Sequence, residues 1–478
     1  MISLRDAGGR RVVTSRSRLA MLLGGLILLI VGQVASGYVH EQSSQAATQT
    51  IVSANAKAFI AYTSNSGSLL MESPKGGTWT GEAWTYPEEL SSTGGTLMWV
   101  RAVSCPLSER YYEKIVVTLS SDARISAFVW TGTTWSVYDD IGAVNSAAAS
   151  YRSFDVVYEG TSGDAVLVYA VDSASGSEDL AYKVWDGSSW STETYINDAG
   201  HGGDINYRWM ALRSDPTAGS DEVALIAVNQ SSGDADAWIW DGSSWGNFME
   251  LETSLSSVRT CECLGLAYES SSGAALFAWC AAGNVEARVW SGSAWEAELP
   301  AVVISVTSNV RWITLKRDPS SDIIMATTID LDDDLNTILW DGASWGVPEE
   351  HATALTTTSR RCADYEWEPS GSTGLLVCSV ESGSLSWKRY VAGGTWSVAS
   401  TVANAGTHIW VTLRRNPREV SGDVKIFGAA LNSNRDLYGF RWDGSTLTFE
   451  GSAFTVDTGS TTYECFDIAV RPMFSPLS

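Results

Sequence analysis

The hexapeptide Trp340-Asp-Gly-Ala-Ser-Trp345 is one copy of a motif, W-x-G-x-x-W, that recurs between residues 79 and 447. Five other copies keep both tryptophans and the glycine, and they begin at Trp79, Trp130, Trp185, Trp240 and Trp290. Two degenerate copies begin at Val391 and Trp442. Successive first positions lie 50 to 55 residues apart, so the chain contains eight copies of a unit of about fifty residues.

Each unit contains short alternating apolar segments that are separated by turn residues. In the sixth unit these segments are residues 311–315, 322–329 and 335–340, followed by a fourth that begins near Trp345. They show no 3.6-residue periodicity, which argues against helices. The Asp-Gly pair before the fourth segment supplies the positive φ angle that a tight hairpin needs. Four strands in each of eight repeats predict an all-β fold, an eight-bladed β-propeller.

The two ends of the repeat array predict how the ring closes. The first repeat has only three strands, which begin near residue 58, whereas residues 462–471 resemble a first strand with nothing after it. We therefore expect the C-terminal strand, 462–471, to pair into blade one and leave no free sheet edge. The predicted domains are a hydrophobic segment at 1–38, a linker or helix extension at 39–53, and the propeller at 54–478.

Even-numbered and odd-numbered repeats differ in their first strand. Each even repeat has a tryptophan seven residues before a proline, at Trp99, Trp209, Trp312 and Trp410. Odd repeats carry another aromatic residue late in the same strand, at Tyr158, Tyr268 and Trp367. This alternation indicates that the ancestral unit was a pair of blades.

The N-terminal segment predicts export. Residues 19–32 contain no polar side chain, and five arginines precede them. By the positive-inside rule the amino end stays in the cytoplasm and the rest of the chain is exported, to an extracellular or cell-surface location. A cleaved signal peptide, a retained anchor that keeps the chain on the membrane, and a pilin-like assembly helix all fit this segment.

In the third interpretation the segment resembles the type IV pilins, because an apolar helix continues into a polar stretch at 42–56. The resemblance implies a helix that assembles copies of the chain into a filament. The sequence departs from the pilin pattern, because two arginines follow Gly8-Gly9 and the apolar run contains no glutamate.

The charge and the motif content exclude several functions. The formal net charge is −24, and so acidic a body repels phosphate backbones, which rules out sequence-independent nucleic-acid binding. The four histidines lie in different segments, and the sequence has no phosphate-binding loop and no H-E-x-x-H motif. No catalytic constellation is evident.

The W-x-G-x-x-W motif has two interpretations. The tryptophans either stack ligands around the rim, as in some propeller lectins, or pack between neighbouring blades. We favour packing, because a residue repeated in every blade usually solves a problem that every blade has. The motif also resembles the Asp-box of sialidase propellers, S-x-D-x-G-x-T-W, although Asp186 and Gly187 are adjacent here. Because Asp-boxes are structural, this resemblance implies no chemistry.

Two groups of residues are candidates for covalent or metal links. Repeat alignment places Cys263 opposite Cys280, and Cys362 opposite Cys378, so each pair forms either a cross-strand disulfide or packed, reduced thiols. Oxygen ligands alternate at Asp330, Asp332, Asp334 and Asn336, which suits Ca²⁺, although a solvated turn explains the same residues.

Five arginines form the candidate ligand-binding site: Arg152, Arg208, Arg259, Arg311 and Arg361. Each lies at or just before the first strand of one of five consecutive repeats. Since first strands line the axis of a propeller, these side chains are expected to converge on one mouth of the channel. Converging guanidinium groups suit a carboxylate or a sulfate. Alternatively, each arginine pairs with a carboxylate such as Glu262 or Glu464 and links adjacent blades.

Two classes of function follow. The first is a non-enzymatic structural or adhesive module at the cell surface that contacts a surface glycan, a protein partner or copies of itself, with assembly into a filament through its N-terminal helix. The second is a carbohydrate-active protein, either a lectin or a sialidase-like hydrolase. We favour the first class on the regular repeats and the hydrophobic N-terminal segment.

Overall fold

The computed structural model describes residues 3–5, 11–13, 58–65, 72–79, 88–89, 95–145, 149–171, 178–197, 205–229, 233–255, 260–381, 383–391, 393–403, 406–417, 423–449 and 458–471. The chain divides into two compact units, Met1–Asn55 and Ala56–Ser478. In the first unit, β1 (Ser3–Arg5) pairs with β2 (Arg11–Val13). The predicted N-terminal helix lies outside the described residues. Within the described ranges every regular element is a strand, and no helix is present that could cross a membrane.

The second unit contains eight antiparallel sheets, which we number in chain order. Sheet 1 has β35 (Phe466–Val470), β3 (Ala58–Asn65), β4 (Glu72–Trp79) and β5 (Glu88–Glu89), and sheet 2 has β6 (Leu97–Ser104), β7 (Lys114–Ser120), β8 (Arg124–Trp130) and β9 (Trp135–Ala143). Sheet 3 has β10 (Phe154–Tyr158), β11 (Ala165–Ala170), β12 (Leu180–Trp185) and β13 (Thr194–Ile196), and sheet 4 has β14 (Tyr207–Ser214), β15 (Val223–Asn229), β16 (Ala235–Trp240) and β17 (Trp245–Glu252).

The remaining four sheets repeat this order. Sheet 5 has β18 (Leu264–Tyr268), β19 (Ala275–Ala281), β20 (Asn284–Trp290) and β21 (Val302–Val303), and sheet 6 has β22 (Val310–Arg317), β23 (Ile324–Asp330), β24 (Leu335–Trp340) and β25 (Glu349–Ala352). Sheet 7 has β26 (Ala363–Trp367), β27 (Gly374–Val380), β28 (Ser384–Val391), β29 (Thr395–Trp396) and β30 (Ser400–Ala403), the last two both paired with β28. Sheet 8 has β31 (His408–Arg415), β32 (Ile426–Asn432), β33 (Leu437–Trp442) and β34 (Leu447–Phe449).

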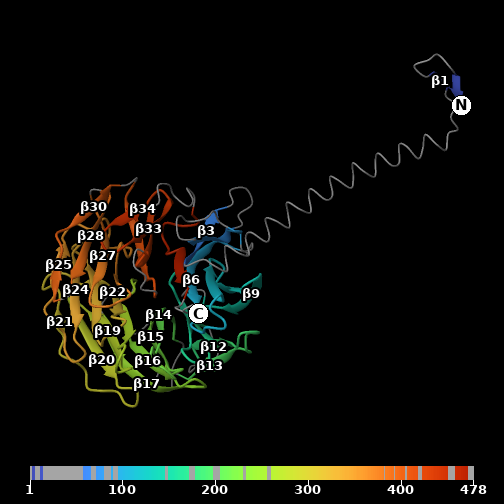
Figure 1. Ribbon diagram of the computed structural model, residues 1–478. Helices are drawn as coiled ribbons and strands as arrows, with labels where there is room; N and C mark the ends of the chain where they lie inside the picture. The colour runs from blue at the N-terminus through green and yellow to red at the C-terminus, as the bar shows by residue number, and fades with distance from the viewer. Residues whose placement is uncertain are drawn as a thin grey trace, which may run out of the picture. The chain divides into compact units, whose positions relative to one another are not determined.

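The first strands of these sheets form a closed ring, which is the arrangement of a β-propeller. They contact one another in the order β35, β6, β10, β14, β18, β22, β26 and β31, and β31 contacts β35 again. In Figure 1 the colours run around the ring until the red C-terminal strands reach the blue β3. β35 pairs antiparallel with β3, from Ala58 opposite Val470 to Tyr62 opposite Phe466. The predicted pairing of the C-terminal strand with the first repeat is therefore confirmed.

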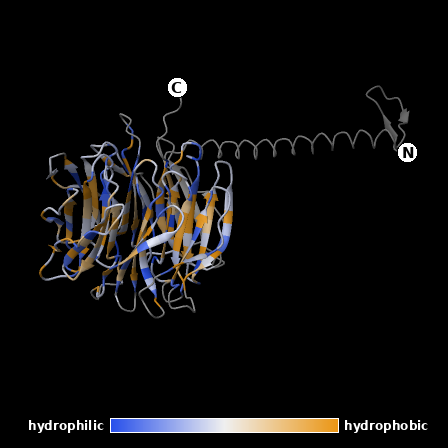
Figure 2. Ribbon diagram, turned by 90° about the horizontal axis from the view of Figure 1, so that it is seen from below, coloured by the Kyte–Doolittle hydropathy of each residue, from blue (hydrophilic) through white to orange (hydrophobic). Residues whose placement is uncertain are grey.

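The core lies between the sheets, where neighbouring sheets face one another. The second strands β7, β15 and β23 are buried along their whole length, whereas the outer strands β9 and β17 consist mainly of half-buried and exposed residues. Figure 2 shows the matching concentration of hydrophobic residues on the strands. Burial on both faces explains the continuous apolar runs in the second strand of each repeat.

The glycine of the motif forms the predicted tight turn. Gly187, Gly242 and Gly342 have φ angles of 90°, 90° and 93°, which few other residues adopt without strain. The preceding aspartate stabilises the same turn, because Asp341 Oδ1 accepts the backbone N–H groups of Ala343 (2.9 Å) and Ser344 (2.8 Å). These hydrogen bonds lower the pKa of Asp341.

Candidate functional site

The first tryptophan of the motif links neighbouring sheets through a buried glutamate. Five of these tryptophans are at most 3% exposed, and each indole N–H donates to a glutamate of the preceding sheet. The pairs are Trp185–Glu113 (3.0 Å), Trp240–Glu159 (2.5 Å), Trp290–Glu222 (3.0 Å), Trp340–Glu269 (2.6 Å) and Trp442–Glu368 (3.0 Å). The geometry therefore supports the packing interpretation of the motif over ligand stacking for this tryptophan.

The alternation between odd and even repeats has a related cause. The hydroxyl groups of Tyr158 and Tyr268 donate to Glu113 (2.8 Å) and Glu222 (2.9 Å), respectively. Each of these glutamates thus accepts one hydrogen bond from a tyrosine and one from a tryptophan of the next sheet. Burial raises the pKa of Glu222, so its carboxylate depends on these donors to offset desolvation.

The second tryptophan of the motif has a different environment. In sheet 6, Trp345 is half-buried and packs edge-to-face on Trp340, with ring centroids 5.5 Å apart. Its indole N–H has no hydrogen-bond partner among the described residues. The two tryptophans of one motif therefore offer a matched test of the glutamate link.

Replacing Trp340 by Phe is expected to destabilise the protein, because the Glu269 carboxylate loses a buried donor. Hydrogen bonds to charged groups contribute about 1.5–3 kcal/mol, and we expect a loss in that range by urea denaturation. Trp345→Phe removes a donor without a partner and is the control, expected to change stability by less than about 0.5 kcal/mol. Equal losses in both variants would contradict the glutamate link.

A ring of four tryptophans lies at one end of the central channel. Trp99, Trp209, Trp312 and Trp410 come from the first strands of sheets 2, 4, 6 and 8, and each is at most 3% exposed. Their ring centroids lie 5.3, 5.7, 5.6 and 6.0 Å apart around the circle, with interplanar angles of 78° to 85°. This edge-to-face geometry is favourable for aromatic rings. The ring forms the floor of a cavity.

The cavity above this floor, which we call the aromatic cup, has a volume of about 330 Å³. Its wall contains Tyr151, Tyr463, Arg311, Arg360 and the hydroxyl residues Ser150, Thr260, Ser359 and Thr462. The guanidinium group of Arg208 lies over the Tyr151 ring, 4.2 Å from its centroid. Arg311 donates to Cys261 Sγ (3.1 Å) and Thr358 Oγ1 (3.4 Å), neither of which is a carboxylate.

A layer of ion pairs lies beside the aromatic floor. Arg152 of sheet 3 pairs with Glu262 of sheet 5, and Arg361 of sheet 7 pairs with Glu464, which precedes β35. Burial lowers the pKa of Arg152 to about 9. Although burial would raise the pKa of Glu464, Arg361 and Arg101 hold it at about 2. Both predicted carboxylates, Glu262 and Glu464, are thus partners of the predicted arginines, but the pairs join sheets that are two apart in the ring and not the adjacent blades of the prediction.

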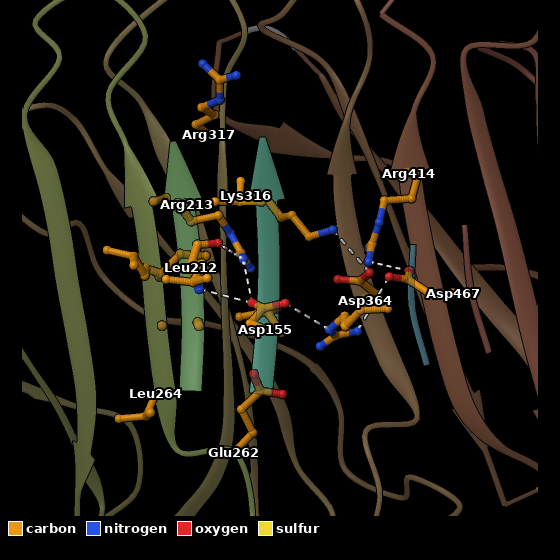
Figure 3. A pocket seen from close by; sticks show the side chains of 18 of the residues that line it. Asp155, Leu212, Arg213, Glu262, Leu264, Lys316, Arg317, Asp364, Arg414 and Asp467 are labelled. Carbon is orange, nitrogen blue, oxygen red and sulfur yellow. Dashed lines mark hydrogen bonds and ion pairs between the residues drawn. The ribbon is translucent and has the colours of Figure 1, made fainter. Parts of the chain in front are cut away.

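A layer of aspartates follows. Asp155, Asp364 and Asp467 occupy equivalent positions in three odd sheets, and each accepts a backbone N–H from the next even sheet. The donors are Leu212 (3.0 Å), Leu413 (2.8 Å) and Ala102 (3.1 Å). Figure 3 shows this bond at Asp155 and the ion pairs that Lys316 and Arg414 make with the other two aspartates. The fourth odd sheet has Gly265 at this position, where a Cβ would lie 2.7 Å from Leu315.

The five predicted arginines do not form one ring. Arg311 lines the aromatic cup, and Arg208 lies over Tyr151 in its wall, whereas Arg152 and Arg361 are buried in ion pairs. Arg259 lies outside the described residues. The structure therefore brings two of the five to one mouth and uses two as links between sheets.

The predicted calcium ligands form a turn. Asp330 Oδ1 accepts the N–H groups of Asp332 (2.9 Å) and Asp334 (3.2 Å), and Asp333 has a φ angle of 63°. In sheet 8 the side chain of Asn432 forms the same turn. No cluster of three or more metal-binding side chains is present among the described residues. These contacts explain the side chain of Asp330 as part of the turn, and the Ca²⁺ site at Asp330, Asp332, Asp334 and Asn336 stays a prediction.

All seven cysteines are buried as thiols in the structure, with no disulfide between them. The backbone N–H of Cys280 donates to the carbonyl oxygen of Cys263 (3.1 Å), so these two residues do lie opposite one another. Cys378 instead pairs in register with Ala363, which shifts it by one residue from Cys362. Adjacent residues of a strand point to opposite faces of the sheet. The side chains of Cys362 and Cys378 therefore point to different faces, which disfavours a disulfide between them.

Sequence reasoning missed three sets of functional residues. The four even-sheet tryptophans were recognised as markers of the alternation, but not as a ring. The aspartates at 155, 364 and 467 carried a signal, since each interrupts an apolar first strand at an equivalent position. Three of the glutamates that accept the motif tryptophans also carried a signal, because Glu159, Glu269 and Glu368 each directly follow the odd-repeat aromatic residue.

Comparisons with known proteins identify the fold. No protein-family model and no curated protein matches the sequence. The BP39L lectin from Burkholderia pseudomallei matches with a TM-score of 0.53 and 11% identity, over 75% of this chain and 99% of that one. The six-bladed lectin of Aleuria aurantia, described with a fucose recognition mode, matches with a TM-score of 0.38 and 14% identity, over 65% and 98%.

A third solved structure, BBS1N in complex with ARL6DN, matches with a TM-score of 0.43 and 10% identity, over 74% of this chain and 94% of that one. At these identities, the match to the BP39L lectin shows a shared β-propeller fold.

Proposed function

We propose that this protein is an eight-bladed, carbohydrate-binding β-propeller that acts by binding, and that the aromatic cup holds the sugar. The proposal takes up the lectin alternative from the sequence, which the propeller lectins among the structural neighbours support better than a filament subunit. Display at the cell surface is part of the proposal and rests on the N-terminal sequence. Membrane association and self-assembly have no support in the described residues.

The observation that carries the proposal is the composition of the aromatic cup. Aromatic rings pack against the apolar face of a sugar, and hydroxyl and guanidinium groups hydrogen-bond to its oxygens. The volume of the aromatic cup, about 330 Å³, is at the lower end of the range for ligand pockets, about 300–1,000 Å³, and suits one or two sugar units. The described lining contains no carboxylate or histidine that could act as a general acid or base, which favours binding over hydrolysis.

The arginines of the cup favour an acidic sugar. Among the described residues, the hydrogen bonds of Arg311 go to a thiol and a hydroxyl group, so its charge is available to a carboxylate or sulfate on a glycan. A second guanidinium, that of Arg208, stands over Tyr151. Planar guanidinium groups bind such oxyanions in a bidentate manner.

The test is a glycan array that includes neutral, uronic and sialylated sugars, followed by titration of the best ligand. Replacing Arg208 and Arg311 together by Ala is expected to weaken binding at least tenfold and to reduce its dependence on salt. Both residues lie at the wall of the cup, and a loss of binding that exceeds any change in the unfolding temperature is the expected result. Arg124→Ala removes an exposed arginine that pairs with Asp140 (2.5 Å) and is the control. Lost stability with unaltered binding would contradict the proposal.

A further inference from the structure

The mouth of the channel opposite the aromatic cup has an excess of positive charge. A cavity of about 300 Å³ opens there, lined by seven cationic and five anionic side chains. The cations are Arg101, Arg213, Lys316, Arg317, Arg361, Arg414 and Arg415, and the anions are Asp155, Glu262, Asp364, Glu366 and Asp467. This local surplus of two positive charges contrasts with the formal net charge of −24 for the chain.

The deeper cations are neutralised by ion pairs. Lys316 Nζ lies 3.2 Å from both Asp364 and Glu366, and Arg414 lies 2.6 Å from Asp467. Arg101 lies 3.4 Å from Asp155 and 3.5 Å from Glu464. These residues stabilise the junctions between sheets and do not account for the surplus.

The surplus lies at the outer edge, on Arg317, Arg415 and Arg213, which we call the arginine mouth. Within the described part of the chain, Arg317 makes no ion pair, and its side chain donates only to Ser270 Oγ (3.4 Å). Figure 3 shows Arg317 apart from every dashed contact at the top of the cavity. Arg415 donates to the backbone oxygen of Arg317 (3.2 Å), and its nearest carboxylate, Glu366, is 3.7 Å away.

Arg213 adds a third cation that shares its counterion. Its side chain is 48% exposed, and its nearest carboxylate, Asp155, is 3.6 Å away. That carboxylate also lies near Arg101 and Arg152 (3.4 and 3.5 Å). One aspartate therefore serves three arginines, and the exposure of Arg213 shows that solvent reaches this level of the channel.

The pKa of Arg317 agrees with an excess of cations over anions at the arginine mouth. Burial, together with the charge of Arg415, lowers the pKa of Arg317 to about 10. Guanidinium groups in such surroundings are stabilised by any anion that enters.

We propose that the arginine mouth binds a divalent tetrahedral oxyanion, sulfate or phosphate, either free or carried by a ligand. The surplus of two charges matches a dianion, and the planar guanidinium groups match its oxygens. This site is separate from the aromatic cup, because the two cavities share no lining residue.

The experiment uses the full-length chain in mild detergent and measures sulfate and phosphate binding by calorimetry at low ionic strength. The wild type is expected to bind both ions, and acetate at least tenfold more weakly. Arg317→Ala is expected to weaken binding at least tenfold, whereas Arg124→Ala, which removes an arginine from the outside of sheet 2, is expected to change it less than twofold. Wild-type protein that binds neither ion, or acetate bound as tightly as sulfate, would overturn the proposal.

A second measurement does not depend on variants. Sulfate is expected to raise the unfolding temperature of the wild type more than chloride does at equal ionic strength, because a bound ion stabilises the folded state. This excess is expected to disappear in Arg317→Ala and to persist in Arg208→Ala/Arg311→Ala. An excess that persists in Arg317→Ala would reflect general salt effects and would overturn the assignment. Because glycan binding is tested on the other pair of arginines, the two proposals fail independently.

Discussion

Deletion of residues 458–478 is expected to abolish the folded ring. The deletion removes β35 and leaves the inner edge of β3 without its partner, which exposes unpaired backbone groups. It also removes the buried side chains of Phe466 and Ile468, each worth about 1.5–3 kcal/mol. Since domains are stable by only about 5–15 kcal/mol, we expect no cooperative unfolding transition in circular dichroism.

The deletion also breaks contacts with both neighbouring sheets. Asp467 accepts the N–H of Ala102 in sheet 2 (3.1 Å) and pairs with Arg414 of sheet 8 (2.6 Å). The matched control is deletion of residues 1–50. These residues lie before the first strand of the ring in the sequence, so their deletion is expected to leave the ring folded. A truncated chain that unfolds cooperatively at the same urea concentration as the control would show that the ring closes without β35.

Replacing Glu464 by Gln is expected to cost about 3–5 kcal/mol of stability, because it removes the closer of the two anions of the buried Arg361 and leaves only Asp364, at 3.5 Å. The same carboxylate lies 3.5 Å from Arg101 and accepts a hydrogen bond from Thr412 Oγ1 (2.6 Å), so the guanidinium groups of Arg101 and Arg361 both lose a negative partner while the glutamine oxygen can still accept from Thr412. Urea denaturation at pH 7 measures the effect.

The control for this substitution is Asp140→Asn. Asp140 pairs with Arg124, but their side chains are 53% and 50% exposed, and such surface pairs contribute about 0–1 kcal/mol. A loss from Glu464→Gln no larger than that from the control would contradict a structural role for the buried pair.

Glu464 also makes stability depend on pH. Its pKa is about 2 in the folded protein, against a reference value of 4.5. A lowered folded-state pKa means that the unfolded chain binds the proton first as the pH falls. The contribution, on the order of 3 kcal/mol, is therefore complete above about pH 4.5 and is lost as the pH falls towards 2. We expect the pH dependence in this range to be weaker in Glu464→Gln than in the wild type.

The sequence by itself determined the β-propeller fold and the partner of its last strand. The evidence is local: a period of 50 to 55 residues, alternating apolar runs, and Asp-Gly turns such as that at Gly342. Each repeat encodes one sheet through contacts between adjacent segments, and a lone C-terminal strand can pair only with an incomplete sheet. The packing role of the first motif tryptophan was predictable for the same reason, since every sheet must pack on the next.

The tertiary structure alone decided which side chains meet between the sheets and in the channel. Trp185 donates a hydrogen bond to Glu113, which is 72 residues earlier in the chain. Arg360 and Arg361 are neighbours, yet the first lines the aromatic cup and the second pairs with Glu464, 103 residues away. Alternate residues of a strand face different sides, and only the closed ring brings strands from distant repeats around one axis. Local patterns therefore specify the sheets, and contacts across the ring specify the site.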